Sequence, residues 1–285
     1  MSSLVLGFII TAGAMVLAVG GLLVFRRLVP SDVLAENHEV AAAMLACLGT
    51  LYAIVLGLVV VEALNRRATA ELQESIEASN LINIANLCRH GDPDFRLSVL
   101  KSELLYTDLV VHEEWPLLAK GTAPDMKAAR ALSDLWGVVA AYEPKTMREQ
   151  DIHSQLLNCL LHVGEARRHR IILSHSGLPP LLWSILIVGG CCTIAFTYLF
   201  APRHVKLQVV MTGVITLVFC LNLLLVLFYS RPYYGDTQIL PLNFKRSLVG
   251  LRHTPNFLDK ISPNGNSDNR GDNGQDDKNG GEEVQ

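Results

Sequence analysis

Charged residues are scarce in this chain and absent from its longest apolar stretches. Asp, Glu, Lys and Arg make up 18% of its 285 residues, whereas soluble domains contain about 25%. Because a helix of about 20 apolar residues spans the hydrocarbon of a bilayer, each stretch is long enough to cross a membrane. We therefore expect an integral membrane protein that contacts the lipid bilayer through four spans, at about residues 4–25, 40–61, 178–201 and 207–230.

The predicted spans also lack Asp, Glu, Lys, Arg and His. Such residues are expected inside the membrane in proton relays and in many coupled transporters, so these classes are disfavoured. The spans contain small and uncharged polar residues at helical spacing instead. In the second span these are Ala42, Ala46, Gly49, Thr50, Ala53 and Gly57; in the third, Gly189, Thr193 and Thr197; in the fourth, Thr212, Thr216 and Asn222.

Two interpretations of these small residues remain open. In the first, they let neighbouring helices pack closely. In the second, the small-residue face of the second span lines a pore of neutral groups with an apolar constriction, which anions pass by partial dehydration. Four helices cannot enclose a wide pore, so the second interpretation requires an oligomer with that face towards the axis.

The features of several other function classes are missing. The net charge is only −3 and no basic patch with interleaved aromatic residues occurs, so we expect no nucleic-acid partner. The six cysteines form no CxxC pair, which disfavours a disulfide framework or a zinc site. No Ser-His-Asp order, glycine-rich phosphate loop or HExxH motif is present. We therefore expect no enzyme, no cofactor and no metal site.

Two His–Glu pairs could still carry chemistry. His162 and Glu165 lie one helical turn apart, but the arginines that follow them oppose a divalent cation, so we interpret this stretch as a basic helix end at the membrane interface. The stretch HEEWP, residues 112–116, could hold an acid/base pair. We interpret it as a helix end with Trp115 in the core.

Helix breakers are missing where the second span runs into charged sequence. No proline occurs between Pro30 and Pro93, and no glycine between Gly57 and Gly91. We predict one helix from about residue 40 to 88, roughly 70 Å long, which crosses the lipid and continues into water. Its lower half carries an apolar stripe that needs cover: Leu64, Ala68, Leu72, Ile76, Ser79 and Ile82.

The remaining polar sequence before the third span also predicts helices and shows no strand pattern. We expect one helix from Pro93 to a stop at Trp115 and Pro116, and another at about 124–142. A third runs from a capping box at Thr146 to about residue 173. The fold class is all-α, with four transmembrane helices and a helical cytosolic domain.

These elements divide the chain into five parts. The first transmembrane pair occupies residues 1–61, the helical cytosolic domain 62–176, and the second pair 177–230. A juxtamembrane segment, 231–261, follows. The tail, 262–285, is rich in Gly, Asn and Asp and has too little apolar area to fold, so we expect it to be disordered.

The basic residues near the spans indicate the orientation. Four spans place both termini and the helical domain on one side, which carries eight basic residues near the membrane against four on the other. The positive-inside rule then favours a cytoplasmic domain, as do the free thiols of Cys88 and Cys159. We expect a multi-pass protein of the inner (plasma) membrane with both termini in the cytoplasm.

Two segments that combine Arg, Pro and aromatic residues flank the second pair of spans, residues 166–183 and 231–244. Anchoring at the membrane interface explains this composition. The candidate functional residues of the two segments are Arg167, Arg168, Pro179, Trp183, Arg231, Pro232, Tyr234, Gly235 and Asp236.

The order of these stretches resembles the bacterial family of bestrophin-like membrane proteins, over about residues 35–244. The stretches concerned are GTLYAIVLGLVVVEA in the second span, HEEWPLLAKG, the Arg-rich run into LPPLLW, and RPYYG. By analogy to true bestrophins, the resemblance implies a pentameric channel for small inorganic ions that the second span lines. We expect a homo-oligomeric channel for small anions. The alternative is a non-conducting scaffold or sensor that couples the bilayer to a cytosolic partner.

One departure from true bestrophins concerns calcium. Those proteins follow the last span with Asn-Pro-Phe-Gly and an acidic run that helps to bind calcium. Here Asp236 is followed by Thr-Gln-Ile-Leu. One carboxylate is too few for a cation that takes about six to eight oxygen ligands, so calcium gating is not expected.

Overall fold

The computed structural model describes residues 3–29, 38–89, 91–200 and 205–252, and this part of the chain contains helices and no strand. The all-α prediction is confirmed, while the predicted disordered tail lies outside the described residues. The helices are α1 (Ser3–Leu28), α3 (His38–Cys88), α4 (Pro93–Leu109), the π-helical η1 (Val110–Glu114), α5 (Trp115–Ala119), α6 (Met126–Ala140), α7 (Met147–His175), α8 (Pro180–Thr197), α9 (Val205–Tyr229) and α10 (Leu242–Arg252).

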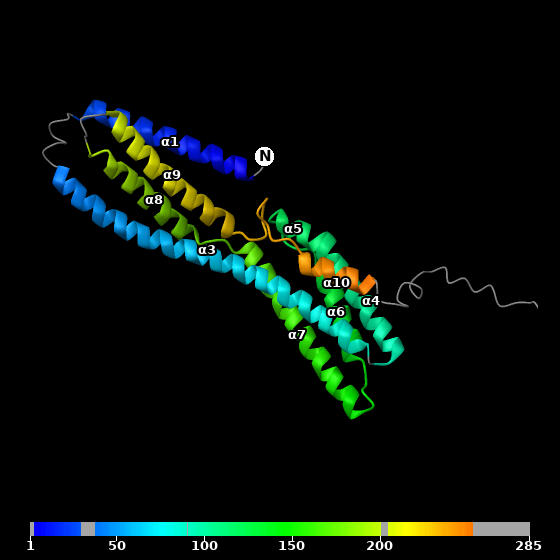
Figure 1. Ribbon diagram of the computed structural model, residues 1–285. Coiled ribbons are helices and arrows are strands. Elements are labelled where there is room, and N and C mark those ends of the chain that lie inside the picture. Colours follow the sequence, from blue (N-terminus) through cyan, green and yellow to red (C-terminus); the bar gives the residue numbers. More distant parts are fainter. Residues whose placement is uncertain (1–2, 30–37, 90, 201–204, 253–285) are drawn as a thin grey trace, which may run out of the picture.

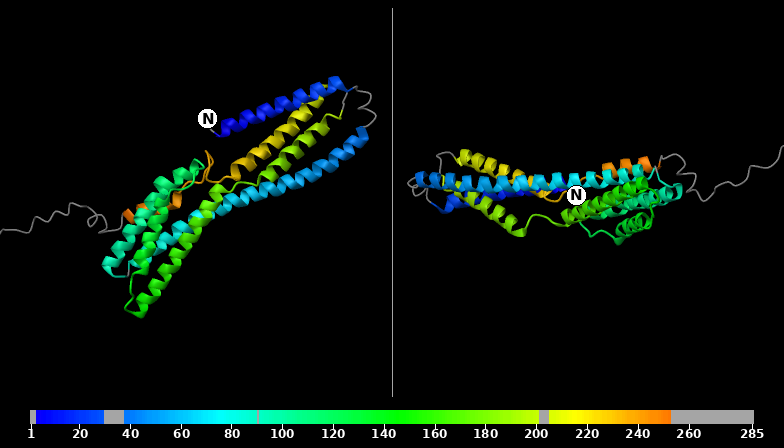
Figure 2. Two further views of the ribbon diagram at one scale, coloured as in Figure 1. Left: turned by 180° about the vertical axis from the view of Figure 1, so that it is seen from behind. Right: turned by 90° about the horizontal axis from the view of Figure 1, so that it is seen from below.

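The molecule is elongated and has two ends of different character (Figure 1). At one end α8 and α9 lie beside the first half of α3, and α1 lies against α9. At the other end α4 to α7 and α10 gather around the second half of α3, as two further views also show (Figure 2). Four helices, α1, α3, α8 and α9, are long and apolar enough to cross a membrane. The prediction of four spans is confirmed, although α8 ends at Thr197, before the predicted residue 201.

Helix α3 joins the two ends. It runs without interruption for 51 residues, which corresponds to about 75 Å at 1.5 Å per residue. The predicted continuous helix is therefore confirmed. Its first half is almost wholly apolar and its second half forms part of the core of the helical domain, so one rigid element passes between two environments.

The stripe of α3 that was predicted to need cover is not the one that the protomer buries. Leu64, Leu72 and Ile82 are 42%, 56% and 41% exposed, so the prediction is wrong within the protomer. The buried stripe was missed because it includes the carboxylates Glu74 and Glu77, which do not count as apolar in a periodicity pattern. It consists of Ala63, Ala70, Glu74, Glu77, Ala78, Leu81, Ile84 and Cys88.

The helix that begins at Pro93 was predicted to stop at Trp115. It instead continues through η1 into α5 and ends at Ala119. The backbone N–H of Trp115 bonds to the carbonyl of Val110, five residues earlier. This wider turn precedes Pro116, which has no N–H to donate and lies in the first turn of α5, where proline is tolerated. The π-helical turn thus lets a helix pass a proline that normally ends one.

Helix α7 begins as predicted. The hydroxyl of Thr146 accepts a hydrogen bond from the backbone N–H of Glu149, and the Glu149 carboxylate accepts one from the N–H of Lys145. Side chains therefore satisfy N–H groups that the first helical turn leaves unpaired. Helix α10 was not predicted: it lies in the segment that we treated as a simple juxtamembrane connection, and its buried residues include Phe244 and Leu248.

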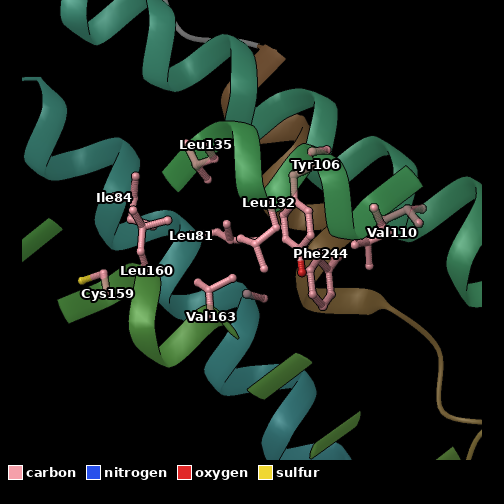
Figure 3. Close-up of a cluster of buried hydrophobic side chains, with 14 of the residues drawn as sticks. Leu81, Ile84, Tyr106, Val110, Leu132, Leu135, Cys159, Leu160, Val163 and Phe244 are labelled. Carbon is pink, nitrogen blue, oxygen red and sulfur yellow. The ribbon is translucent and has the colours of Figure 1, made fainter. Parts of the chain in front are cut away.

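The main apolar core lies in the helical domain (Figure 3). Helix α10 closes one side of this core with Phe244, which is fully buried. The other core side chains come from α3, α4, η1, α5, α6, α7 and the segment after α9, among them Leu81, Ile84, Tyr106, Val110, Leu132, Leu135, Cys159, Leu160 and Val163.

A smaller cluster holds the membrane helices together around Tyr52 of α3. The Tyr52 hydroxyl donates a hydrogen bond of 2.9 Å to the carbonyl of Leu186 in α8, and its ring meets Phe219 of α9 edge-on. The ring lies against Gly189 and Gly190 so closely that a Cβ on Gly189 would be 2.6 Å from Tyr52 Cδ2. Close packing therefore explains these glycines of the third span.

The threonines of the third and fourth spans are also packing residues. Thr193, Thr197, Thr212 and Thr216 are all buried. The hydroxyls of Thr193 and Thr216 donate to carbonyls one helical turn earlier, and those of Thr197 and Thr212 lie 3.3 Å apart across the α8–α9 contact. For these two spans the packing interpretation of the small and hydroxyl residues is confirmed.

The contact between Gly189 and Tyr52 leads to a first prediction. We expect Gly189→Ala to destabilise the protein by about 1–3 kcal/mol, because the added methyl group forces the Tyr52 ring to shift. Gly20→Ala, on α1, is the control, since nothing lies within 4 Å of the position that its methyl group would occupy. Thermal unfolding in detergent measures both; equal melting temperatures for the two variants would show that the contact does not constrain α8.

Candidate functional site

The six pore-lining candidates lie on a face of α3 that the protomer leaves free. Ala46, Thr50, Ala53 and Gly57 are exposed, and Ala42 and Gly49 are half-buried. At 100° per residue, this face lies roughly 100° around the helix from the buried one. A Cβ added to Gly49 or Gly57 would meet nothing within 4 Å. The small residues of α3 thus differ from those of α8, which contact other helices of the same chain.

The bulky residues of the first half of α3 lie on another side. Met44, Leu51 and Leu58 are 57%, 61% and 67% exposed, and their spacing places them on the opposite side of the buried face from the small residues. The exposed surface of this helix therefore has a smooth side and a bulky side. A smooth side permits the backbone of another helix, or an ion path, to approach closely.

A network of buried charges lies in the helical domain next to the membrane end. Arg170 of α7 is fully buried and donates to both carboxylate oxygens of Glu77 of α3, at 2.9 and 3.0 Å. Its Nη2 also lies 2.8 Å from Oε1 of Glu114 in η1. Arg167 pairs with the other oxygen of Glu114 at 2.6 Å. Two carboxylates face two guanidinium groups, so the network carries no net charge.

Aromatic rings enclose the network. The Arg170 guanidinium lies 5.0 Å from the ring centroid of Trp115 and 5.8 Å from that of Phe244, and the Tyr106 hydroxyl donates to Glu77. Burial alone would lower the pKa of Arg170, but the charges of Glu77 and Glu114 outweigh burial and raise it. Burial, together with the charge of Glu77, raises the pKa of Tyr106. Arg170 therefore keeps its positive charge at physiological pH.

The segment after α9 is fastened along α3 below the membrane. The Tyr233 hydroxyl donates to the carbonyl of Ala70 at 3.1 Å, and Arg67 donates to the carbonyl of Thr237 at 2.7 Å. Further along, Asn243 donates from its backbone and side chain to the two carboxylate oxygens of Glu74. The end of the last span is thus connected to α3 at three successive heights.

The HEEWP stretch and the segment after α9 meet at Trp115. Its indole N–H donates to the carbonyl of Ile239 at 2.8 Å, and its ring lies edge-on to Tyr233. Trp115 is in the core, as predicted, but Glu114 is buried too: it accepts a hydrogen bond from Arg167 and forms an ion pair with Arg170. The stretch therefore anchors the segment that follows the last span.

The juxtamembrane candidates separate into two groups. Pro232 is buried, whereas Arg231, Tyr234 and Asp236 are exposed and Gly235 has a φ of 75°. Among the others, Pro179 caps α8, Trp183 packs on the membrane cluster and Arg168 is exposed.

Two interpretations of the arginine-rich stretch are corrected. Arg170 is not part of an interfacial basic helix end, since it is fully buried, and Arg167 is in an ion pair. Glu77 was missed altogether. Its position on the same helix face as Ala70, Leu81 and Ile84 was a usable signal, because a carboxylate on a buried face requires a cationic partner.

Another buried carboxylate, Glu103 of α4, has no cationic partner among the described residues. It is fully buried, and neither oxygen has a hydrogen-bond partner among the described residues. Burial raises its pKa well above the usual 4.5. Burial, with a contribution from Glu103, likewise raises the pKa of the Cys88 thiol to about 12. Burial without a cationic partner thus favours the protonated form of Glu103.

The His–Glu pair of α7 is a surface pair. His162 Nδ1 lies 3.6 Å from Glu165 Oε2, and both side chains are about half exposed. No third His, Cys, Asp or Glu of the described chain joins them or any similar group in a way that could hold a metal ion.

Comparisons with known proteins agree with this architecture. A family model described as the bestrophin-like domain matches residues 12–244, and no curated protein matches the chain. Crystal structures of a bacterial Bestrophin homolog from Klebsiella pneumoniae are similar. Two point-mutant structures have TM-scores of 0.66 and 0.67 at 13% and 12% identity; they cover 86% and 85% of this chain and 99% of theirs. A structure obtained by Zn-SAD phasing has a TM-score of 0.62 at 15% identity, with 84% and 97% covered.

The buried network leads to a second prediction. We expect Arg170→Met to cost about 3–5 kcal/mol of folding stability, because it leaves Glu77 and Glu114 charged and without their shared partner. Arg168→Met, on an exposed position two residues away, should change stability by less than about 0.5 kcal/mol. Urea unfolding in detergent, followed by circular dichroism, compares the two. A similar loss in both variants would contradict the role given to Arg170.

Glu103 leads to a third prediction, on pH. The unfolded chain releases the Glu103 proton near its ordinary pKa, whereas the folded protein retains it, so stability falls as pH rises above about 4.5. Glu103→Gln cannot lose a proton. As pH rises, the unfolding free energy of this variant should therefore increase relative to that of the wild type, by up to about 1.4 kcal/mol per pH unit. Unfolding at several pH values tests this; parallel profiles would mean that Glu103 is ionised in the fold.

Proposed function

Because the chain belongs to the bestrophin-like family, as the match over residues 12–244 shows, we propose that it forms a homo-oligomeric ion channel with α3 lining the pore. The permeant species in this proposal are small inorganic anions. Five subunits follow from the analogy to true bestrophins. The pore-lining residues are Ala42, Ala46, Gly49, Thr50, Ala53 and Gly57, with the constriction near Gly49–Gly57.

The observation that carries the proposal is the free face of α3 along both halves of the helix. In the membrane half this face carries the small residues, with open space at Gly49 and Gly57. In the helical domain, roughly the same side carries Leu64, Leu72 and Ile82, all exposed. Apolar residues in a row on a helix that faces water usually mark an interaction surface. Copies of the chain arranged around an axis would cover this row and leave the small residues next to a central path.

The chemistry of that face favours anions over coupled transport. The four membrane helices place no charged side chain within their apolar spans, so no group there is suited to carry a proton or to bind a metal cation tightly. The hydroxyl of Thr50 is exposed and bonds to the carbonyl of Ala46. Neutral walls with an apolar constriction suit weakly hydrated anions and can close by dewetting.

The orientation in this proposal places the helical domain, residues 62–176, and both termini in the cytoplasm. The parts 1–61 and 177–230 are then the membrane pairs, and 231–261 is the connection to the tail. The free thiols of Cys88 and Cys159 are buried in the helical domain, which suits a reducing compartment. The segment after α9, held by Arg67 and Glu74, would transmit movement between the last span and the pore helix.

Ion flux tests the proposal, and Gly57 gives the fourth prediction. We expect purified protein in liposomes to pass chloride, and Gly57→Leu to lower single-channel conductance because its side chain narrows the path. Gly13→Leu is the control, since nothing lies within 4 Å of that position on α1. An absence of flux under any voltage, pH or calcium condition would refute the channel.

The mass of the detergent-solubilised particle separates the channel from the scaffold. A ring of five subunits fits the channel, whereas a monomer or dimer that retains one stoichiometric cytosolic partner fits a non-conducting scaffold or sensor. Gly57→Leu should leave this mass unchanged if it acts on the path alone. A variant that loses both its mass and its conductance would instead show that Gly57 is a packing residue between subunits.

A further inference from the structure

The start of α1 and the end of α9 both lie on the side of the membrane helices that faces the helical domain (Figure 1). A groove lies between these two helix ends. Its volume is about 260 Å³. The walls are apolar up to one end, where an arginine and a tyrosine follow the last turn of α9. The lining residues are Leu6, Gly7, Ile10, Leu227, Phe228, Arg231 and Tyr234.

The groove lies at a point where α1 and α9 approach each other over Gly7. A Cβ on this glycine would lie 3.0 Å from Cδ2 of Leu224 and 3.5 Å from the ring of Phe228. A side chain here would therefore compete for the space that the groove occupies. Because both helices are membrane spans, the apolar part of the groove opens towards hydrocarbon rather than water.

The polar end of the groove is a cation, Arg231, for which no ion pair is found among the described residues. Arg231 is exposed. Its neighbours at the same boundary differ: Arg66 pairs with Glu62 at 3.0 Å and Arg67 with Glu71 at 3.1 Å. An anionic group is thus the complementary partner for Arg231.

The position of Arg231 is determined by the two turns beside it. Its guanidinium lies 6.0 Å from the ring centroid of Tyr234. Tyr234 in turn packs on Gly121, where a Cβ would be 3.3 Å from the ring. Gly121 has a φ of 71° and Gly235 one of 75°, conformations that favour glycine. The HEEWPLLAKG and RPYYG stretches therefore build this end of the groove together.

We propose that the groove binds an anionic phospholipid, with one acyl chain between α1 and α9 and the phosphate on Arg231. Arginine matches phosphate oxygens with paired N–H groups, and the phosphate layer of a bilayer lies where apolar spans end. A soluble phosphate would satisfy the cation and leave the apolar walls unfilled, so the occupant is a lipid. The site does not depend on whether the chain conducts ions.

Lipid titration in native mass spectrometry tests the site. Purified protein in detergent is titrated with palmitoyl-oleoyl phosphatidylglycerol, with the matching phosphatidylcholine, and with soluble glycerol 3-phosphate. We expect phosphatidylglycerol to bind in preference to phosphatidylcholine, with no comparable binding of glycerol 3-phosphate. Arg231→Gln should weaken phosphatidylglycerol binding about tenfold or more, since a charge-assisted hydrogen bond is lost.

Two further variants make the test specific. Arg246→Gln removes the same charge from an exposed position on α10 and should leave the preference intact. Gly7→Leu fills the groove but retains Arg231. It should weaken the binding of both phosphatidylglycerol and phosphatidylcholine relative to the control variant Gly13→Leu.

Three outcomes would overturn the proposal. Equal preference for phosphatidylglycerol in the wild type and in Arg231→Gln would exclude the phosphate contact. Binding of glycerol 3-phosphate as tight as that of the lipid would assign a soluble ligand instead. Cross-links from Ile10 to a neighbouring copy, with no lipid bound, would show that another subunit fills the groove.

Discussion

The buried pairing of Arg170 with Glu77 and Glu114 is the interaction on which the rest of the helical domain depends. It joins α3, η1 and α7, three elements far apart in sequence. Taking these groups out of water is costly unless every charge has a partner. The arrangement therefore tolerates little change in helix positions. Around it, Trp115 and Phe244 exclude water, and Trp115 also holds the segment that follows α9.

The second constraint is the continuity of α3. Because α3 is one continuous helix of 51 residues, its two halves cannot rotate independently about the helix axis. The ion pairs of Glu77 therefore also determine which side of the membrane half faces the rest of the protomer. Tyr52 and Leu56 occupy that inner side, and the small residues fall beside it. In the proposed channel, the electrostatics of the helical domain would thus orient the pore face without any charged residue in the membrane.

Small residues serve two different purposes in this fold, and sequence could not separate them. Gly189 lies against Tyr52, whereas Gly57 faces open space; both occur in apolar runs with the same spacing. The difference comes from a single aromatic side chain of another helix. A pattern within one segment contains no information on which neighbour will occupy the space beside it. For the same reason the exposed row Leu64, Leu72 and Ile82 was mistaken for the buried one.

The sequence by itself determined the four spans, the long uninterrupted α3, the all-α class and the cap of α7 at Thr146, because each depends on hydropathy, helix breakers or capping within a short window. Only the tertiary structure decided that Arg170 is buried against Glu77, that Trp115 holds the segment after α9, and that α10 folds back beside α3. The contacts concerned join residues that lie 93, 124 and 169 positions apart in the chain. Their energies arise from desolvation and contact across helices, which no local pattern records.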